Sequence, residues 1–335
     1  MTGYASQYPR PDHFVLHLSD THFLANGGKL YDSLDSEVKL RQLFAELEES
    51  NSRPEAIIFT GDIADKGDPV AYRAIREIVE PAAERLGARV VWVMGNHDNR
   101  SAFNAHLLDE AASEDPIDRV IDINGLRIIS LDSTVLDHHY GHVTDAQLLW
   151  LQNVLATPAP HGTILAMHHP PVPAVLDLAV TVELRGQKEL AAVIRGSDIR
   201  SIIAGHLHYS TAATFAGIPV SVASATCYTQ DLNVAVGGSR GRDGAQSFNL
   251  VHVYDDTVLH SVVPLGDYGS LAYVTPEETA AILVKEGITI APAVNPHVTA
   301  SVTTDSTADA APTTVADDTQ SDVATNTISA ITVAA

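Results

Sequence analysis

The stretch Val90-Val91-Trp92-Val93-Met94-Gly95-Asn96-His97-Asp98 decides the fold of this 335-residue chain. Its apolar half is typical of a buried strand, and its polar half is typical of the loop that follows such a strand. In α/β folds, ligands bind at the carboxyl ends of parallel strands, so the loop at residues 95–98 is a candidate site. The same pattern of a buried strand followed by polar residues recurs at 16–22, 57–62, 164–169 and 202–208.

Strand and helix patterns alternate along the first hundred residues, and this alternation predicts an α/β fold built from parallel crossover units. Strands are expected at 14–18, 56–60 and 90–94, with amphipathic helices at 36–50 and 69–86. Further on we expect a hairpin around Asn124-Gly125, helices at 101–108, 144–155 and 187–195, and buried strands at 162–167 and 199–204. Four short β-rich segments suggest a second sheet stacked on the first: 211–215, 219–223, 249–254 and 257–263.

Composition limits the classes of partner. The 42 acidic residues exceed the 20 basic ones and give a formal charge of −22, which repels nucleic acids and anionic membrane surfaces. The single cysteine, Cys227, excludes an internal disulfide and a thiolate cluster, and it fits a reducing compartment. No apolar run is long enough to cross a bilayer, and the N-terminus has no apolar leader. We therefore expect a soluble cytoplasmic protein.

The domain organisation follows from a change in composition near residue 292. Residues 1–291 are expected to form one domain, because the chain carries enough hydrophobic residues for one large core. Residues 292–335 are rich in Thr, Ala and Asp, and they lack Lys and Arg. Such a segment cannot bury enough apolar surface to offset its conformational entropy, so we predict a disordered tail.

The residues at the strand ends are metal-ligand types. All are oxygen or nitrogen donors, which suit zinc, manganese, iron or cobalt and exclude a sulfur site. Any one of them could be an ordinary core or loop residue, but five strand ends that agree in order are not expected by chance. They are too many for one catalytic ion and suit two, with one bridging carboxylate. The predicted metal ligands are Asp20, His22, Asp62, Asn96, His168, His206 and His208.

Two ions held by two aspartates favour a singly charged phosphodiester as the substrate. A hydroxide that bridges the ions would attack the phosphorus in line with the leaving oxygen. His97 is expected to stabilise the phosphoryl oxygens or to protonate the leaving oxygen, and Asp98 to orient His97. Asn96, His97 and Asp98 are thus the predicted catalytic residues.

As a set, these motifs resemble the calcineurin-like metallophosphoesterase superfamily. The likeness runs from about residue 14 to residue 265 and includes Asp20-x-His22, Gly61-Asp62, residues 95–98, His168 and Gly205-His206-x-His208. Three further segments, at 59–67, 168–171 and 217–228, are similar to the class III cyclic nucleotide phosphodiesterases.

The resemblance implies a four-layer α/β/β/α sandwich of two stacked mixed sheets between helices, and commonly a homodimer. It implies hydrolysis of 3′,5′-cyclic AMP, and of cyclic GMP, to the 5′-monophosphate, with side activity on 2′,3′-cyclic nucleotides. One ion, usually iron, would be held by Asp20, His22, Asp62 and His208. Asp62 would bridge to a second ion, usually manganese, completed by Asn96, His168 and His206.

Substrate contacts are predicted at His22, Asn96, His97 and His208, and at His139 in the loop His138-His139-Tyr140, for which a solvated loop is the alternative. The glycine-rich segment 237–244 is interpreted as a surface or dimer-contact loop. The alternative enzymes are a glycerophosphodiester or pyrophosphate hydrolase with the same site. A binding scaffold that has lost its metals is a further alternative, which the retention of all predicted ligands disfavours.

Overall fold

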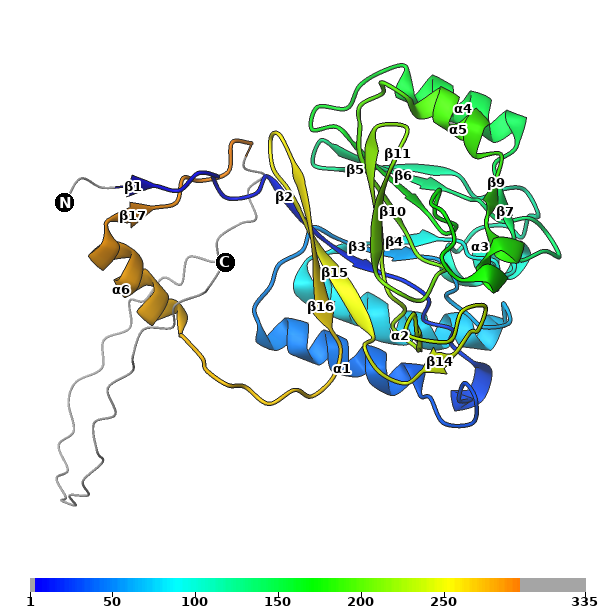
Figure 1. Cartoon of the computed structure of the whole chain (residues 1–335), viewed down its shortest axis with the longest axis horizontal. Helices are drawn as coiled ribbons and strands as arrows, with labels where there is room; N and C mark the ends of the chain where they lie inside the picture. The colour runs from blue at the N-terminus through cyan, green and yellow to red at the C-terminus, as the bar shows by residue number, and fades with distance from the viewer. Residues whose placement is uncertain (1–3, 296–335) are drawn as a thin grey trace. The chain divides into compact units, whose positions relative to one another are not determined.

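The computed structural model describes residues 4–295, and these form two large sheets with helices on the outer face of each, besides three two-stranded pairs and the helix α6 (Figure 1). The helices are α1 (Ser36–Glu49), α2 (Pro69–Leu86), α3 (Arg100–Leu107), α4 (Asp145–Leu155), α5 (Gln187–Ile194) and α6 (Pro276–Glu286), with the 3₁₀ turns η1 (Ala25–Gly27) and η2 (Asp177–Val182). In this part of the chain, no helix is long and apolar enough to span a membrane.

The first sheet has the strand order β16-β15-β2-β3-β4, in which β2, β3 and β4 are parallel and β15 and β16 run antiparallel. Its strands are β2 (His13–Leu18), β3 (Ala56–Thr60), β4 (Arg89–Val93), β15 (Ser247–Val253) and β16 (Val258–Pro264).

The second sheet has the order β11-β12-β10-β8-β6-β5, with parallel strands at its centre and an antiparallel strand at each edge. Its strands are β5 (Arg119–Ile123), β6 (Leu126–Leu131), β8 (Thr163–Met167), β10 (Ile199–Ala204), β11 (Thr211–Phe215) and β12 (Ile218–Val222). The short strands outside the two sheets are β1 (Tyr4–Ala5), β7 (Gly141–His142), β9 (Leu184–Arg185), β13 (Thr229–Gln230), β14 (Gly241–Arg242) and β17 (Ile288–Thr289).

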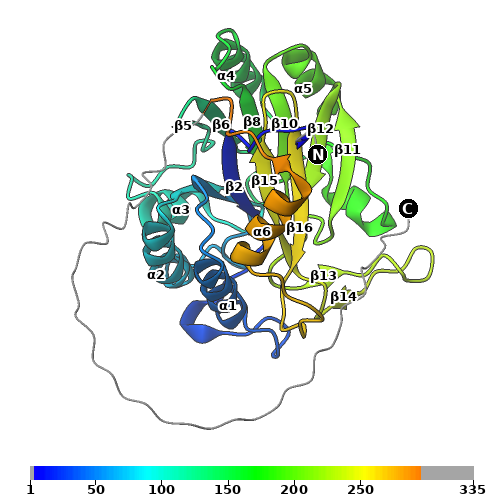
Figure 2. The same cartoon turned by 90° about the vertical axis from the view of Figure 1, so that its left-hand side faces the viewer.

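Three apolar clusters hold the layers together, because each central strand is buried on both faces. In β3, Ile57 packs toward α1 and α2, whereas the next residue, Ile58, packs between the two sheets. In β8, Ile164 lies between the sheets and Leu165 faces α4 and α5. Figure 2 shows α4 and α5 on one side of the sheets and α1 and α2 on the other. The four-layer α/β/β/α sandwich is therefore confirmed.

Helix starts follow the expected capping chemistry. Asp68 caps α2 by accepting from the backbone N–H of Val70, ahead of Pro69 at the first helical position. At α4, the hydroxyl of Thr144 and the amide side chain of Gln147 form a reciprocal capping box. The capping box predicted from the sequence is thus present.

The partition of strands between the sheets differs from the prediction. The four late β-rich segments do not form a second sheet of their own: β11 and β12 extend the sheet of β10, whereas β15 pairs with β2. Backbone pairing partners depend on long-range packing, which a local pattern does not encode. The helix α6, followed by β17 paired with β1, was not expected. The predicted tail lies outside the described residues except for 292–295.

Replacing Arg127 should destabilise the fold. Its guanidinium bonds both oxygens of Asp198 at 2.7 and 2.9 Å, and it also bonds the carbonyls of Val154 and Thr157. Arg127→Met leaves the mostly buried Asp198 without its counter-charge, so we expect a loss of about 3 kcal/mol in the free energy of unfolding, measured with urea. The matched control is Arg41→Met, which removes an exposed pair with Glu37 and should cost little. Equal losses in both variants would contradict this account.

Candidate metal centre

Five strand ends bring all the predicted donors together. The loops after β2, β3 and β4 come from one sheet, and those after β8 and β10 come from the other. The carboxyl ends of these parallel strands meet at one edge of the sandwich, which is where α/β sheets place their ligands. The donors that meet there are Asp20, His22, Asp62, Asn96, His168, His206 and His208.

The first half of the cluster contains Asp20, His22, Asp62 and His208, whose donor atoms all lie within 4.8 Å of one another. His22 Nε2 lies 3.2 Å from His208 Nε2 and 3.4 Å from Asp62 Oδ2. His208 Nε2 is 3.4 Å from Asp20 Oδ1. These are the four residues that the resemblance groups around one ion.

The second half is built around His168. Its Nε2 lies 3.0 Å from Asn96 Oδ1, 3.2 Å from His206 Nδ1 and 3.3 Å from Asp62 Oδ2. Asp62 Oδ2 is therefore close to both halves. The other oxygen, Oδ1, accepts a hydrogen bond of 2.8 Å from the backbone N–H of His97. This contact fixes the carboxylate with Oδ2 between the two halves.

Each of the four imidazoles has one nitrogen that points out of the cluster and donates to a protein oxygen. A carbonyl or an ionised carboxylate oxygen can only accept, so the outer nitrogen carries a hydrogen and the inner nitrogen is the one that can bind a metal ion. Two inner nitrogens that face each other at 3.2 Å require a proton or a cation between them. The outer contacts are His22 Nδ1 to Asp65 Oδ1, His168 Nδ1 to Thr60 O, His206 Nε2 to Val182 O and His208 Nδ1 to Tyr228 O, at 2.7–3.0 Å. The donor set thus fits metal ions.

The backbone at this edge is strained. Asp20, His22, Asp62, His206 and His208 all have positive φ, between 44° and 71°. Left-handed backbone costs about 1–3 kcal/mol per non-glycine residue and is typical of functional sites. The close approach of the loops also requires two glycines. A Cβ on Gly95 would collide with the backbone of Asp62, and one on Gly205 would collide with Ser19.

Charges within the cluster shift the protonation of both carboxylates and imidazoles. Burial raises the pKa of Asp20, but the charge of His208 outweighs burial and lowers it to about 2. Burial also opposes ionisation of Asp62, yet His168 and His22 hold its pKa well below the usual range. In turn, the carboxylates outweigh burial and raise the pKa of His168 to about 9 and that of His208 to about 10. The two aspartates therefore stay charged in the interior.

His97 is held differently from the prediction. Its Nδ1 donates to the carbonyl of Asp65 at 2.9 Å, and Asp98 does not orient it. Asp98 instead accepts from the backbone N–H groups of Ile63, Ala64 and Gly95 and from the hydroxyl of Tyr72. The reason is that Asp98 turns back toward the loop after β3. Its contacts hold that loop, which carries Asp62, against the loop of Asn96 and His97.

A cavity of about 420 Å³ opens over the cluster, and His139, the residue predicted to contact substrate, is one of its lining residues. His139 Nδ1 lies 3.0 Å from Asn96 Nδ2, so it accepts from that amide and keeps the amide oxygen toward His168. His169, which was not among the predicted ligands, contacts Ser133 Oγ with Nδ1 and the carbonyl of His139 with Nε2. His169 therefore supports the His139 loop.

Several residues of the site have no sequence motif. Asp65, which supports both His22 and His97, could have been suspected from its position three residues after Asp62. The rest of the cavity wall comes from η2 and the residue before it, from the loop after β10, and from the segments around β13 and β14; of these only η2 has no sequence signal, and Ser239 shows that part of the glycine-rich segment 237–244 lines the cavity. These residues are Leu176, Leu178, Ala179, Thr181, Val182, Leu207, Tyr209, Tyr228, Gln230 and Ser239.

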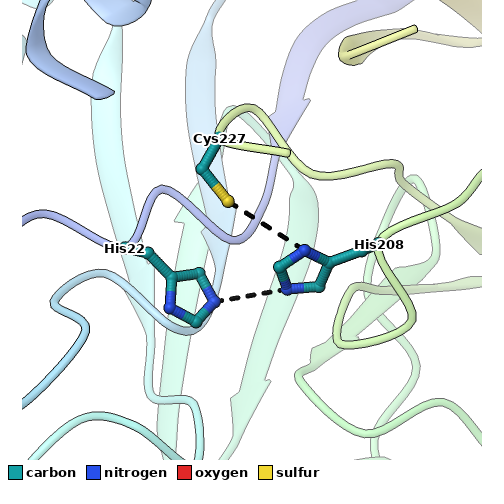
Figure 3. Close-up of side chains that lie close together, drawn as sticks. All are labelled: His22, His208 and Cys227. Carbon is teal, nitrogen blue, oxygen red and sulfur yellow. Dashed lines mark hydrogen bonds between the residues drawn. The ribbon is translucent and has the colours of Figure 1, made fainter. Parts of the chain in front are cut away.

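Cys227 is buried beside the first half of the cluster (Figure 3). Its sulfur lies 4.0 Å from His208 Nδ1, whereas His22 approaches the same ring at Nε2. The sequence pattern excludes sulfur from the site, but the structure brings a thiol next to a donor. Because His208 Nδ1 already donates to the carbonyl of Tyr228, the thiol lies behind the ring and not among the inner donors.

Comparisons with known proteins agree with this geometry. The chain is 59% identical over 291 residues to a protein of Rhodococcus erythropolis named as a probable cyclic nucleotide phosphodiesterase, covering 87% of this chain and 96% of that protein. It is 59% identical over 289 residues to a cAMP/cGMP dual specificity phosphodiesterase of Mycobacterium tuberculosis, covering 86% and 91%.

Among solved structures, a dimetal phosphatase of Danio rerio superposes with a TM-score of 0.53 at 15% identity, covering 75% of this chain and 96% of that protein, and it shows a shared fold. The model of the calcineurin-like phosphoesterase family matches residues 15–210, which include every predicted metal ligand. The sandwich, the order of the strand-end donors and this match lead to one conclusion: the chain is a metal-dependent enzyme of the calcineurin-like phosphoesterase family.

Proposed function

We propose that this enzyme hydrolyses 3′,5′-cyclic nucleotides to nucleoside 5′-monophosphates at a two-metal site. The pairs of inner imidazole nitrogens 3.2 Å apart carry the proposal, because each pair, together with Asp62 Oδ2, frames a position for a cation. The cyclic nucleotide substrate is supported by the names of the two relatives above, which are similar to this chain over nearly their whole length.

In this proposal, the metal-binding residues divide between the two ions as the donors divide between the two halves of the cluster. Asp20, His22 and His208 would hold one ion, Asn96, His168 and His206 the other, and Asp62 would bridge them. Bound divalent or trivalent ions supply a water nucleophile that is deprotonated at neutral pH and positive charge for the phosphoryl oxygens. Iron and manganese as the ions, a homodimer, and activity on cyclic GMP and 2′,3′-cyclic nucleotides remain part of the proposal, derived from the resemblance.

The protein residues above the cluster would act on the phosphodiester itself. His97 donates its Nδ1 hydrogen to the carbonyl of Asp65, so Nε2 carries a hydrogen only in the imidazolium form, and in that form it would pass this proton to the departing 3′-oxygen and become neutral. Since His139 accepts from Asn96 through Nδ1, its Nε2 carries the hydrogen of the neutral ring and can donate to a phosphoryl oxygen. Opening the ring adds water across the P–O3′ bond and releases the 5′-monophosphate.

The substrate proposal is tested with purified, metal-loaded protein. We expect 5′-AMP as the chromatographic product from 3′,5′-cyclic AMP, together with cleavage of bis-(p-nitrophenyl) phosphate. Asp62→Asn should lose both activities and bound metal while remaining folded by circular dichroism. Release of glycerol 3-phosphate from a glycerophosphodiester, without cleavage of cyclic AMP, would replace this proposal with the alternative enzyme.

The role of His97 can be tested by comparing two substrates whose leaving groups differ in basicity. A sugar alkoxide needs a proton to depart, whereas p-nitrophenolate does not. His97→Ala should therefore lower kcat for cyclic AMP by about 10²-fold or more and lower kcat for bis-(p-nitrophenyl) phosphate much less. A similar loss on both substrates would show instead that His97 acts on the phosphoryl oxygens.

Metal binding should release protons. At pH 7.5 the metal-free protein holds protons on His168 and His208, whose pKa values of about 9 and about 10 lie above that pH. A metal ion must displace them, so affinity should fall as pH is lowered and rise toward pH 9–10. Titration calorimetry of Mn²⁺ into metal-free protein in Hepes and in Tris measures the release, because the two buffers differ in ionisation enthalpy. Identical heats in both buffers would rule the release out.

A further inference from the structure

The walls of the cavity differ in chemistry from its floor. At the floor lie the imidazoles and Asp62, and one wall is an apolar surface from η2 formed by Leu176, Leu178 and Val182. Another segment contributes Gln230 of β13 and Ser239, which precedes β14, to the lining of the same cavity. None of the described lining residues is Arg or Lys. Beyond the reacting phosphate, the cavity therefore favours an uncharged group with apolar faces and a polar edge.

A nucleobase has these properties, since its faces are apolar and its edge carries donors and acceptors. A cavity of about 420 Å³ is within the usual size range for small-molecule sites. A second phosphate would find an apolar wall without a cation to neutralise it. If the phosphodiester lies at the metal centre, the η2 wall is available for the face of a base.

The backbone of Gln230 is hydrogen-bonded to the backbone of His208, one of the predicted metal ligands. Its backbone N–H donates to the carbonyl of His208 at 2.9 Å. The strand β13 then pairs with β14, with Gln230 opposite Gly241. The connection between the two strands is closed by Asp231, whose carboxylate bonds Arg240 and Arg242. The backbone of Gln230 is thus held at a fixed place, and its side chain lines the cavity.

The amide of Gln230 has a partner that accepts either orientation. Ser239 Oγ lies 3.2 Å from Gln230 Oε1 and donates to it. A hydroxyl is both donor and acceptor, so Ser239 can equally accept from Nε2 if the amide is inverted. Adenine presents an N6 donor beside the N1 acceptor, and guanine presents the O6 acceptor beside the N1 donor. An amide matches both edges, one in each orientation.

We propose that Gln230, with Ser239 as its reversible partner, reads the edge of the purine base, and that this pair lets one site accept both adenine and guanine cyclic nucleotides. The inference rests on the proposed function, because it assumes a nucleotide whose phosphate lies at the metal centre. Gln230 is a specificity-determining residue in this account and takes no part in the reaction of the phosphodiester.

The test changes the amide to a carboxylate, which only accepts hydrogen bonds. Gln230→Glu should favour guanine, which offers N1 and N2 donors, and disfavour adenine, whose N1 is an acceptor. We expect the ratio of kcat/KM for cyclic GMP to that for cyclic AMP to rise about 10-fold or more over the wild-type ratio. Bis-(p-nitrophenyl) phosphate, which has no base, should be cleaved at nearly the wild-type rate.

Two control variants test whether the change in the kcat/KM ratio depends on the position of Gln230. Gln152→Glu introduces the same charge at an exposed position of α4 that does not line the cavity, and it should leave the ratio unchanged. Ser239→Ala removes the reversible partner and should change the ratio less than Gln230→Glu. An unchanged ratio in Gln230→Glu, or an equal loss on all three substrates, would overturn the base-reading role while the proposed function stands. Absence of cyclic nucleotide hydrolysis by the wild-type enzyme would overturn both proposals.

Discussion

Asp20 and Asp62 lie fully buried among four imidazoles, and a buried carboxylate costs several kcal/mol unless positive charge balances it. That requirement determines the architecture around them. The imidazoles come from loops after β2, β8 and β10, and each is held from behind by a protein oxygen, so the neutralising groups cannot move away. The left-handed backbone at five of the donors and the glycines that let the loops approach are further costs of bringing these groups together.

Because the carboxylates are balanced within the cluster, the acidic composition of the chain does not prevent it from binding an anion. The formal charge of −22 acts at long range, where salt screens it. A diester inside the cavity interacts mainly with groups a few ångströms away, which are imidazoles, Asp62, side-chain amides and hydroxyls, and apolar side chains, without Arg or Lys among the described lining residues. The local arrangement of charge, and not the net charge, therefore decides what the site can bind.

Much of the architecture was predictable, because buried parallel strands have a distinct pattern. Continuous apolar runs that end at a polar loop indicate β3, β8 and β10, and the polar residues after them were the right candidates for the cluster. The helix α2 has the ends that were predicted for it, and in the structure Asp68 caps its start and Gly87 its end. The sequence also predicted that the donors gather in one cluster, because the order of five loops is improbable by chance, and the structure brings them together.

The remaining features depend on contacts that no local pattern contains. The pairing of β15 with β2 joins residues more than 200 positions apart, so the partition of the late strands could not be read from periodicity. The turn η2 is short, exposed and without a period, yet it forms a wall of the cavity. Asp65 and Gln230 matter only through what the fold brings next to them. By contrast, α6 was missed although Thr275, Glu278 and Gly287 carry capping signals, because its helix buries no side chain completely.

The sequence separation of the donors has a consequence for how the enzyme matures. Asp20 and His208 are nearly 190 residues apart, and the cluster draws on both sheets, so it exists only after these long-range pairings have formed. Closing such loops is the slow part of folding. An ion that needs donors from both sheets can therefore be held by the complete set only once these pairings are in place. Which metal the enzyme carries is then settled by the ions present where folding finishes, since the same nitrogen and oxygen donors accept several of them.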